Sequence, residues 1–122
     1  MRFNSQINFG KIACILTQAA QGFSAITGCN LIVSDMVYSL ADLSMNIHSG
    51  GLKEPYFIAI REMGTESGNK EHCLDRCKGL GYPLLIAKIE RDRVIDMNMT
   101  IMLTHNWMNG DNNYMEQEFN SL

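Results

Sequence analysis

The residues with the greatest chemical potential in this 122-residue chain lie in the segment His72-Cys73-Leu74-Asp75-Arg76-Cys77. Cys73 and Cys77 are four residues apart, so on a helix both thiols project from one face and could bind the same zinc ion. His48 or the distant His105 would have to supply further ligands across the fold, and His72 beside Cys73 is a further candidate. A zinc site normally takes a second ligand pair of this kind, so we favour the alternative of two small thiols packed in the core.

The same residue types could also support cysteine chemistry. Cys73 or Cys77 would act as the nucleophile if the fold brought it to His105, with Asp96 orienting the imidazole. The chain contains no Gly-x-Ser-x-Gly elbow, no Walker-type loop and no His-Glu-x-x-His motif. We therefore predict no catalytic residue, no cofactor and no bound metal. A cysteine- or zinc-dependent enzyme is the least favoured function.

Composition indicates one globular domain over residues 1–122, because 46% of the residues are hydrophobic and only 19% are charged. The net charge of -3 and the pI of about 5.5 argue against nucleic acid as a partner, since binding to phosphates needs clustered Lys and Arg. No apolar run approaches the roughly 20 residues that span a bilayer. We expect a soluble cytoplasmic protein with free thiols and no membrane contact.

A helix is predicted for the first part of the chain, because apolar residues between Ile12 and Ile26 recur at steps of three and four. Asn8 is the expected N-cap of this helix, and Gly28 is its expected C-terminal stop.

Three strands are expected next, over residues 29–33, 42–48 and 56–62. Residues 36–44 fit either a helix or a strand, and the alternation of apolar and polar side chains over residues 42–48 favours a strand there. The segment 56–62 is dense in aromatic and β-branched residues, which favour strands.

The second half of the chain is expected to form a loop over residues 64–69, a short helix over 70–78 and an antiparallel pair of strands over 84–90 and 94–104. Ser67 or Asn69 is the expected N-cap of the helix. The last strand alternates between an inward set (Ile95, Met97, Met99, Ile101, Leu103) and an outward set (Asp96, Asn98, Thr100, Thr104), which predicts one buried face. Residues 106–122 are expected to form a polar tail that ends in a short helical turn.

Together these elements predict an α+β fold of two layers. A largely antiparallel sheet of about five strands packs under the N-terminal helix, with a short helix between strands three and four. This order is similar to that of the small acidic chaperones of bacterial type III secretion, which are dimers that bind extended segments of an effector. It also resembles small sensory domains of the GAF or PAS type, which hold a ligand over their sheet.

The candidate protein-binding residues are Met102, Trp107, Met115 and Phe119. Met102 lies on the polar face of the last strand and Trp107 follows it, while Met115 and Phe119 share a helical face with Leu122. Trp and Met are enriched in the cores of protein interfaces. We therefore expect a non-catalytic protein-interaction module, such as a chaperone, adaptor or inhibitor, with a protein partner and the ability to form a homodimer.

The alternative function is a small-molecule sensor of the GAF or PAS type. Its pocket would lie between the first helix and the sheet, with a lining of Phe23, Phe57, Met97 and Met99.

Overall fold

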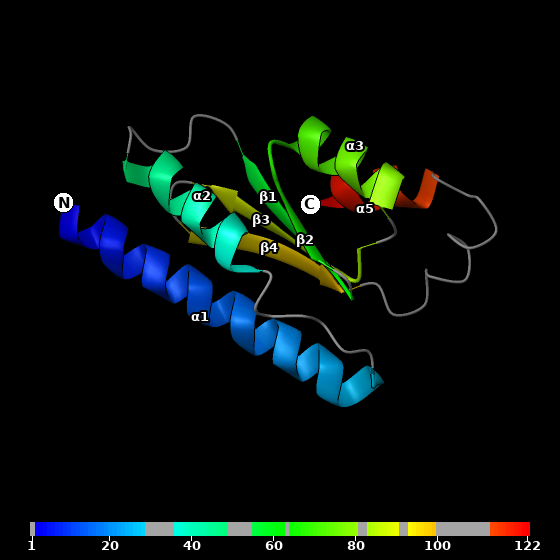
Figure 1. Ribbon diagram of the computed structural model, residues 1–122, viewed down its shortest axis with the longest axis horizontal. Helices are drawn as coiled ribbons and strands as arrows, with labels where there is room; N and C mark the ends of the chain where they lie inside the picture. The colour runs from blue at the N-terminus through cyan, green and yellow to red at the C-terminus, as the bar shows by residue number, and fades with distance from the viewer. Residues whose placement is uncertain are drawn as a thin grey trace.

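The computed structural model describes residues 2–28, 36–48, 55–62, 64–80, 83–90, 93–99 and 113–122. Along the chain the elements are α1 (Arg2–Thr27), α2 (Met36–His48), β1 (Tyr56–Arg61), β2 (Gly64–Gly68), α3 (Lys70–Leu80), β3 (Leu85–Glu90), β4 (Arg93–Met99) and α5 (Asn113–Ser121). Figure 1 shows the long helix α1 running below the sheet, with α2 beside it and α3 and α5 on the far side.

The four strands of the described residues form one sheet in the order β2-β1-β3-β4, and every neighbouring pair is antiparallel. The central strands β1 and β3 are buried almost throughout, which explains their nearly continuous apolar sequences. In β1 Ile58 faces the layer of α1 and α2, and Phe57 faces the layer of α3 and α5, because successive side chains of a strand point to opposite faces. The α+β class and the antiparallel sheet are therefore confirmed.

Helices cover both faces of this sheet, so each face has its own hydrophobic core. The first core joins α1 and α2 to the sheet and contains Ile12, Leu16, Ala20, Phe23, Leu43, Ile47, Tyr56, Ile58, Ile60, Leu84, Leu85, Ala87 and Ile89. The second core joins α3 and α5 to the opposite face and contains Phe57, Ala59, Cys73, Cys77, Ile86, Met115 and Phe119. The predicted two-layer arrangement under the N-terminal helix thus describes only one side of the sheet.

Helix α1 begins earlier than the sequence pattern indicated. It starts at Arg2, so Asn8 lies inside the helix and its prediction as N-cap is wrong. The C-terminal stop at Gly28 is confirmed: this residue has a φ of 77°, and its N–H donates to the Ser24 carbonyl at 2.9 Å. Glycine is the residue that adopts this left-handed conformation without steric cost.

Residues 42–48 are helical, and the predicted strand there is wrong because they belong to α2. Leu43 and Ile47 are buried, but Met45, the apolar residue between them, is 70% exposed. Apolar residues four apart make one helical stripe, whereas a strand would have buried Met45 with its neighbours. The alternation over residues 42–48 thus arises from two different faces of one helix.

Residues 64–68 form the edge strand β2, and the predicted loop there is wrong. The strand pairs with β1, with Ala59 opposite Glu66 and Phe57 opposite Gly68. Its sequence is Gly-Thr-Glu-Ser-Gly, which lacks the apolar alternation that marks a strand. Main-chain pairing with β1, rather than its own hydrophobic side chains, holds it in the sheet.

The last strand is interrupted by a bulge. Lys88 lies opposite Asp96 but Ile89 lies opposite Val94, so Ile95 is the extra residue on β4. Val94 and Met97 pack on the first core, and Ile95 is 42% exposed. The prediction that Ile95 faces inward is therefore wrong.

Several predicted elements agree with the structure, and others lie outside the described residues. The strands β1 and β3 and the helix α3 match their predicted positions, and the Asn69 side chain caps α3 by accepting from the His72 N–H at 2.8 Å. The predicted strand at residues 29–33 and the part of the last strand beyond Met99 lie outside the described residues. Within the described ranges, no helix combines the length and the apolar character needed to cross a membrane.

Candidate functional site

The predicted zinc and nucleophile residues do not share one surface. Cys73 and Cys77 are buried in the second core, whereas His72 is exposed on α3. A hydrogen bond with Cys77 raises the pKa of the Cys73 thiol far above its usual range, and burial of the thiol is the second largest cause. The Cys73 thiol is therefore protonated at neutral pH in this environment, whereas the thiolate is the reactive form of a cysteine.

Within the described part of the chain, the two buried cysteines have no third side chain that would complete a metal site. Cys73 donates its S–H to the main-chain oxygen of Glu66 at 3.7 Å. The described residues contain no group of three His, Cys, Asp or Glu side chains that could hold a metal ion. His105 lies outside these residues, so its approach to the cysteines stays a prediction. The three described cysteines, Cys14, Cys73 and Cys77, are free thiols.

A polar hollow lies where α2 and α3 meet the edge strand β2. Its volume is about 340 Å³, and it is lined by Tyr38, Ser39, Asp42, Thr65, Glu66, Ser67, His72 and Arg76. Three elements bring these side chains together, namely α2, β2 and α3. Part of α2 had been predicted as a strand, and β2 had been predicted as a loop. This explains why the sequence pattern did not reveal the hollow.

Glu66 is the centre of the charges at this hollow. One carboxylate oxygen lies 3.0 Å from the guanidinium of Arg61 and the other lies 3.6 Å from that of Arg76. Arg61 and Glu66 are both buried, so their pairing offsets the cost of removing two charges from water. The carboxylate therefore ties two neighbouring strands to α3.

Tyr56 connects the same hollow to α2. Its hydroxyl donates to the carboxylate of Asp42 in a short hydrogen bond. Burial of the ring, together with the Asp42 hydrogen bond, raises the pKa of the Tyr56 phenol far above its usual range. The phenol is thus a fixed proton donor and not a base at neutral pH.

Gly68 positions His72 at the edge of the hollow. Its φ is 141°, and a Cβ on Gly68 would lie 2.8 Å from Cδ2 of the His72 ring. Only glycine therefore fits below this imidazole. The hollow is built as a structural network of polar contacts.

The predicted protein-binding residues divide into two groups. Met102 and Trp107 lie outside the described residues. Met115 and Phe119 are buried in the second core, where the ring of Phe119 lies 5.6 Å from that of Phe57. Met115 and Phe119 therefore pack in the second core of this molecule, and their role in binding a protein stays a prediction.

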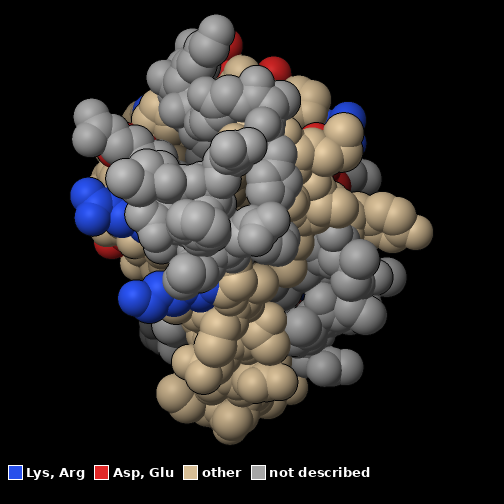
Figure 2. All heavy atoms as spheres, turned by 90° about the vertical axis from the view of Figure 1, so that its left-hand side faces the viewer, with Lys and Arg blue, Asp and Glu red and all other residues tan. Residues whose placement is uncertain are grey.

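Among the described residues, the most exposed large apolar side chains lie on the helices α1 and α2, and Ile95 of β4 is exposed to a smaller extent. Tyr38 and Met45, which are two turns apart on α2, are 84% and 70% exposed, and Ile26 of α1 is 80% exposed. Residues 10–28 and 36–48 carry only two charged side chains, Lys11 and Asp42. Figure 2 shows the lowest part of the molecule, where the C-terminal half of α1 lies, without charged residues. We call the exposed side of these two segments the helical face.

Comparison with known proteins gives no match among family models, curated proteins or solved structures. A fold class alone does not determine function.

Proposed function

We propose that this protein is a non-catalytic protein-interaction module, of the kind represented by small chaperones, adaptors and inhibitors, and that two copies pair through the helical face. The observation that carries the proposal is the exposure of Tyr38 and Met45 on one side of α2. Large apolar side chains on a surface with few charges are typical of interface cores, where charged residues are depleted and Tyr and Met are enriched.

The outer side of α1 fits a second copy of the same helix. Cys14, Gln18, Gln21 and Ala25 are exposed at steps of four, three and four, which is the spacing of a helix–helix seam. These side chains are neutral, so two identical copies bring no like charges together along the seam. Gly22 lies beside them with open space above it, which lets another helix approach closely.

The size of the helical face sets the expected affinity. At 1.5 Å per residue and a width of about 10 Å, the segments 10–28 and 36–48 present a footprint of about 500 Å². Stable complexes bury about 800 Å² per partner, so this face lies below the standard size. We therefore expect a dimer with a dissociation constant on the order of micromolar.

Sedimentation velocity between 1 and 200 µM tests the proposal. We expect the 13.7 kDa chain to sediment as a dimer at the upper end and to dissociate on dilution. The double variant Tyr38→Glu/Met45→Glu should stay monomeric, because four charges would meet across the interface. Both sites are exposed, so the variant should remain folded.

The matched control is Gln117→Glu/Asn120→Glu, which makes two neutral-to-acidic changes at exposed positions of α5 on the opposite side of the sheet. It should dimerise like the wild type. A wild-type monomer at 200 µM, or equal loss of dimer in both double variants, would refute pairing through the helical face.

A further inference from the structure

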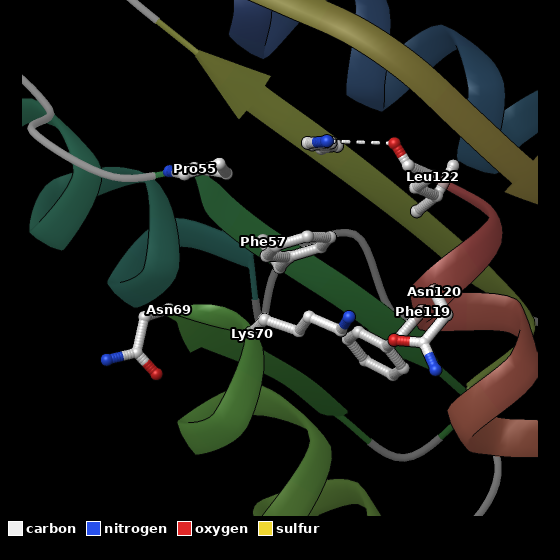
Figure 3. Close-up of a pocket in the computed structure, with 8 residues that line it drawn as sticks. Pro55, Phe57, Asn69, Lys70, Phe119, Asn120 and Leu122 are labelled. Atoms are coloured by element: carbon white, nitrogen blue, oxygen red, sulfur yellow. Dashed lines mark hydrogen bonds between the residues drawn. The ribbon is translucent and has the colours of Figure 1, made fainter.

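A second hollow lies on the opposite side of the sheet, between the start of α3 and the end of α5. Its volume is about 230 Å³, and it is lined by Pro55, Phe57, Asn69, Lys70, Lys88, Phe119, Asn120 and Leu122. Figure 3 shows these residues arriving from β1, β3 and both helices around one depression. It shares no lining residue with the polar hollow at β2.

The inner wall of this hollow is apolar and fixed. Phe57 comes from the central strand β1 and Phe119 from α5, and both are buried. Their rings lie 5.6 Å apart at an angle of 48°. The two rings therefore form the floor of the hollow, and an apolar group seated above this floor would lose part of its contact with water.

The charged side chains in the lining are those of two lysines, Lys70 and Lys88. The ammonium group of Lys88 donates to the main-chain oxygen of Leu122 at 2.8 Å and lies 3.8 Å from the carboxylate of Glu90. Lys70 makes no ion pair with any residue that the structure describes. Figure 3 shows its side chain reaching across the hollow toward Phe119 and Asn120.

The contact of Leu122 illustrates the chemistry that this hollow accepts. Its main-chain oxygen is held by Lys88, and its side chain packs on the second core. Leu122 thus offers an oxygen acceptor to a lysine and an apolar side chain to the core. Lys70 and the two phenyl rings offer the same combination in the space beside it.

We propose that this hollow binds a small monocarboxylate with an aromatic or aliphatic body. The body lies against Phe57 and Phe119, and the carboxylate accepts hydrogen bonds from Lys70. A phosphate ester fits less well, because Lys88 is already engaged and only one lysine remains for its two charges. The site lies across the sheet from the helical face, so it stands independently of the proposed dimer.

Titration of the ¹⁵N-labelled protein with 4-phenylbutyrate, followed by amide chemical shifts, tests this proposal. The neutral probe 4-phenylbutanamide has nearly the same shape and no charge. We expect the acid to bind with a dissociation constant on the order of millimolar or below, given about 0.3 kcal/mol per heavy atom. The amide should bind about tenfold more weakly, since its oxygen still accepts a hydrogen bond from Lys70 but the negative charge of the carboxylate is lost. Shifts should centre on Phe57, Lys70 and Phe119.

The variants Lys70→Met and Lys78→Met separate the site from general charge effects. Both remove a lysine from α3, but Lys78 pairs with Glu116 and does not line the hollow. Lys70→Met should raise the dissociation constant of the acid about tenfold and that of the amide by a smaller factor. Equal affinity for acid and amide, equal weakening by both variants, or shifts centred away from β1 and α5 would each overturn the proposal.

Discussion

The buried carboxylate of Glu66 offers the sharpest test of how the edge strand β2 is held. The side chains of Arg61 and Glu66 are only 10% and 11% exposed, and their charged atoms lie 3.0 Å apart. Glu66→Gln keeps the shape of the side chain but leaves the guanidinium of Arg61 buried without this carboxylate. Removal of one partner from a buried ion pair costs about 3–5 kcal/mol. Because glutamine retains an acceptor oxygen, we expect a loss of about 2–3 kcal/mol of unfolding free energy.

Arg76 provides the matched control on the same carboxylate. Its side chain is 57% exposed and lies 3.6 Å from Glu66. Arg76→Gln should therefore cost less than about 1 kcal/mol, as is usual for a solvated ion pair. The apolar double variant Arg61→Met/Glu66→Leu should recover most of the loss, because it removes both buried charges together.

Urea unfolding followed by circular dichroism measures all of these variants. With a slope of about 2 kcal/mol per molar urea, Glu66→Gln should lower the midpoint by about 1 M or more. The reasoning is refuted if that midpoint shifts by less than about 0.3 M. It is also refuted if Arg76→Gln costs as much as Glu66→Gln, since burial would then not decide the energy.

Two further predictions concern buried titratable groups. Cys14 is exposed, whereas Cys73 is a buried thiol with a raised pKa. Ellman's reagent at pH 8 should therefore modify Cys14 at least tenfold faster than Cys73 in the folded protein. Equal rates for the two thiols would contradict the burial of Cys73. The pKa of Tyr56 is higher in the folded state than the value of about 10 that it has in the unfolded chain. Its contribution to stability is therefore complete at pH values below about 10 and is lost as the pH rises above 10. Tyr56→Phe should thus cost about 1 kcal/mol at pH 7 and weaken the alkaline decline in stability, which urea unfolding between pH 7 and 11 measures.

Those parts of the fold that depend on a single periodic pattern were predictable from the sequence. The stripe from Ile12 to Ile26 indicated α1, although Ile26 itself is exposed, and the apolar runs of β1 and β3 indicated buried strands. The predictions are wrong where an apolar residue faces solvent and not the core. Met45 looked like part of a strand because it is an apolar residue on the outer side of a helix, and Ile95 is turned outward by a bulge that depends on the partner strand.

The polar hollow was unpredictable for a related reason. Glu66 has the sequence surroundings of a surface loop, and only its pairing opposite Ala59 places it in the sheet. Arg61 stands at the end of β1, and nothing in its neighbours indicates a buried partner five residues later. Tertiary contacts of this kind are set by strand register, which a glycine-rich edge strand specifies weakly in its sequence.

The helical face and the carboxylate hollow lie on opposite sides of the sheet, and the central strand β1 contributes side chains to both sides. Phe57 forms part of the carboxylate hollow, and its neighbour Ile58 lies in the core below the helical face. Both residues are buried, and β1 is bonded to a strand on each side, so a ligand cannot move one without breaking the sheet. Coupling between two sites requires an element with two arrangements that each ligand prefers differently. The structure shows β1 in one register with each neighbouring strand, so we expect occupation of the hollow to leave the dimerisation constant unchanged.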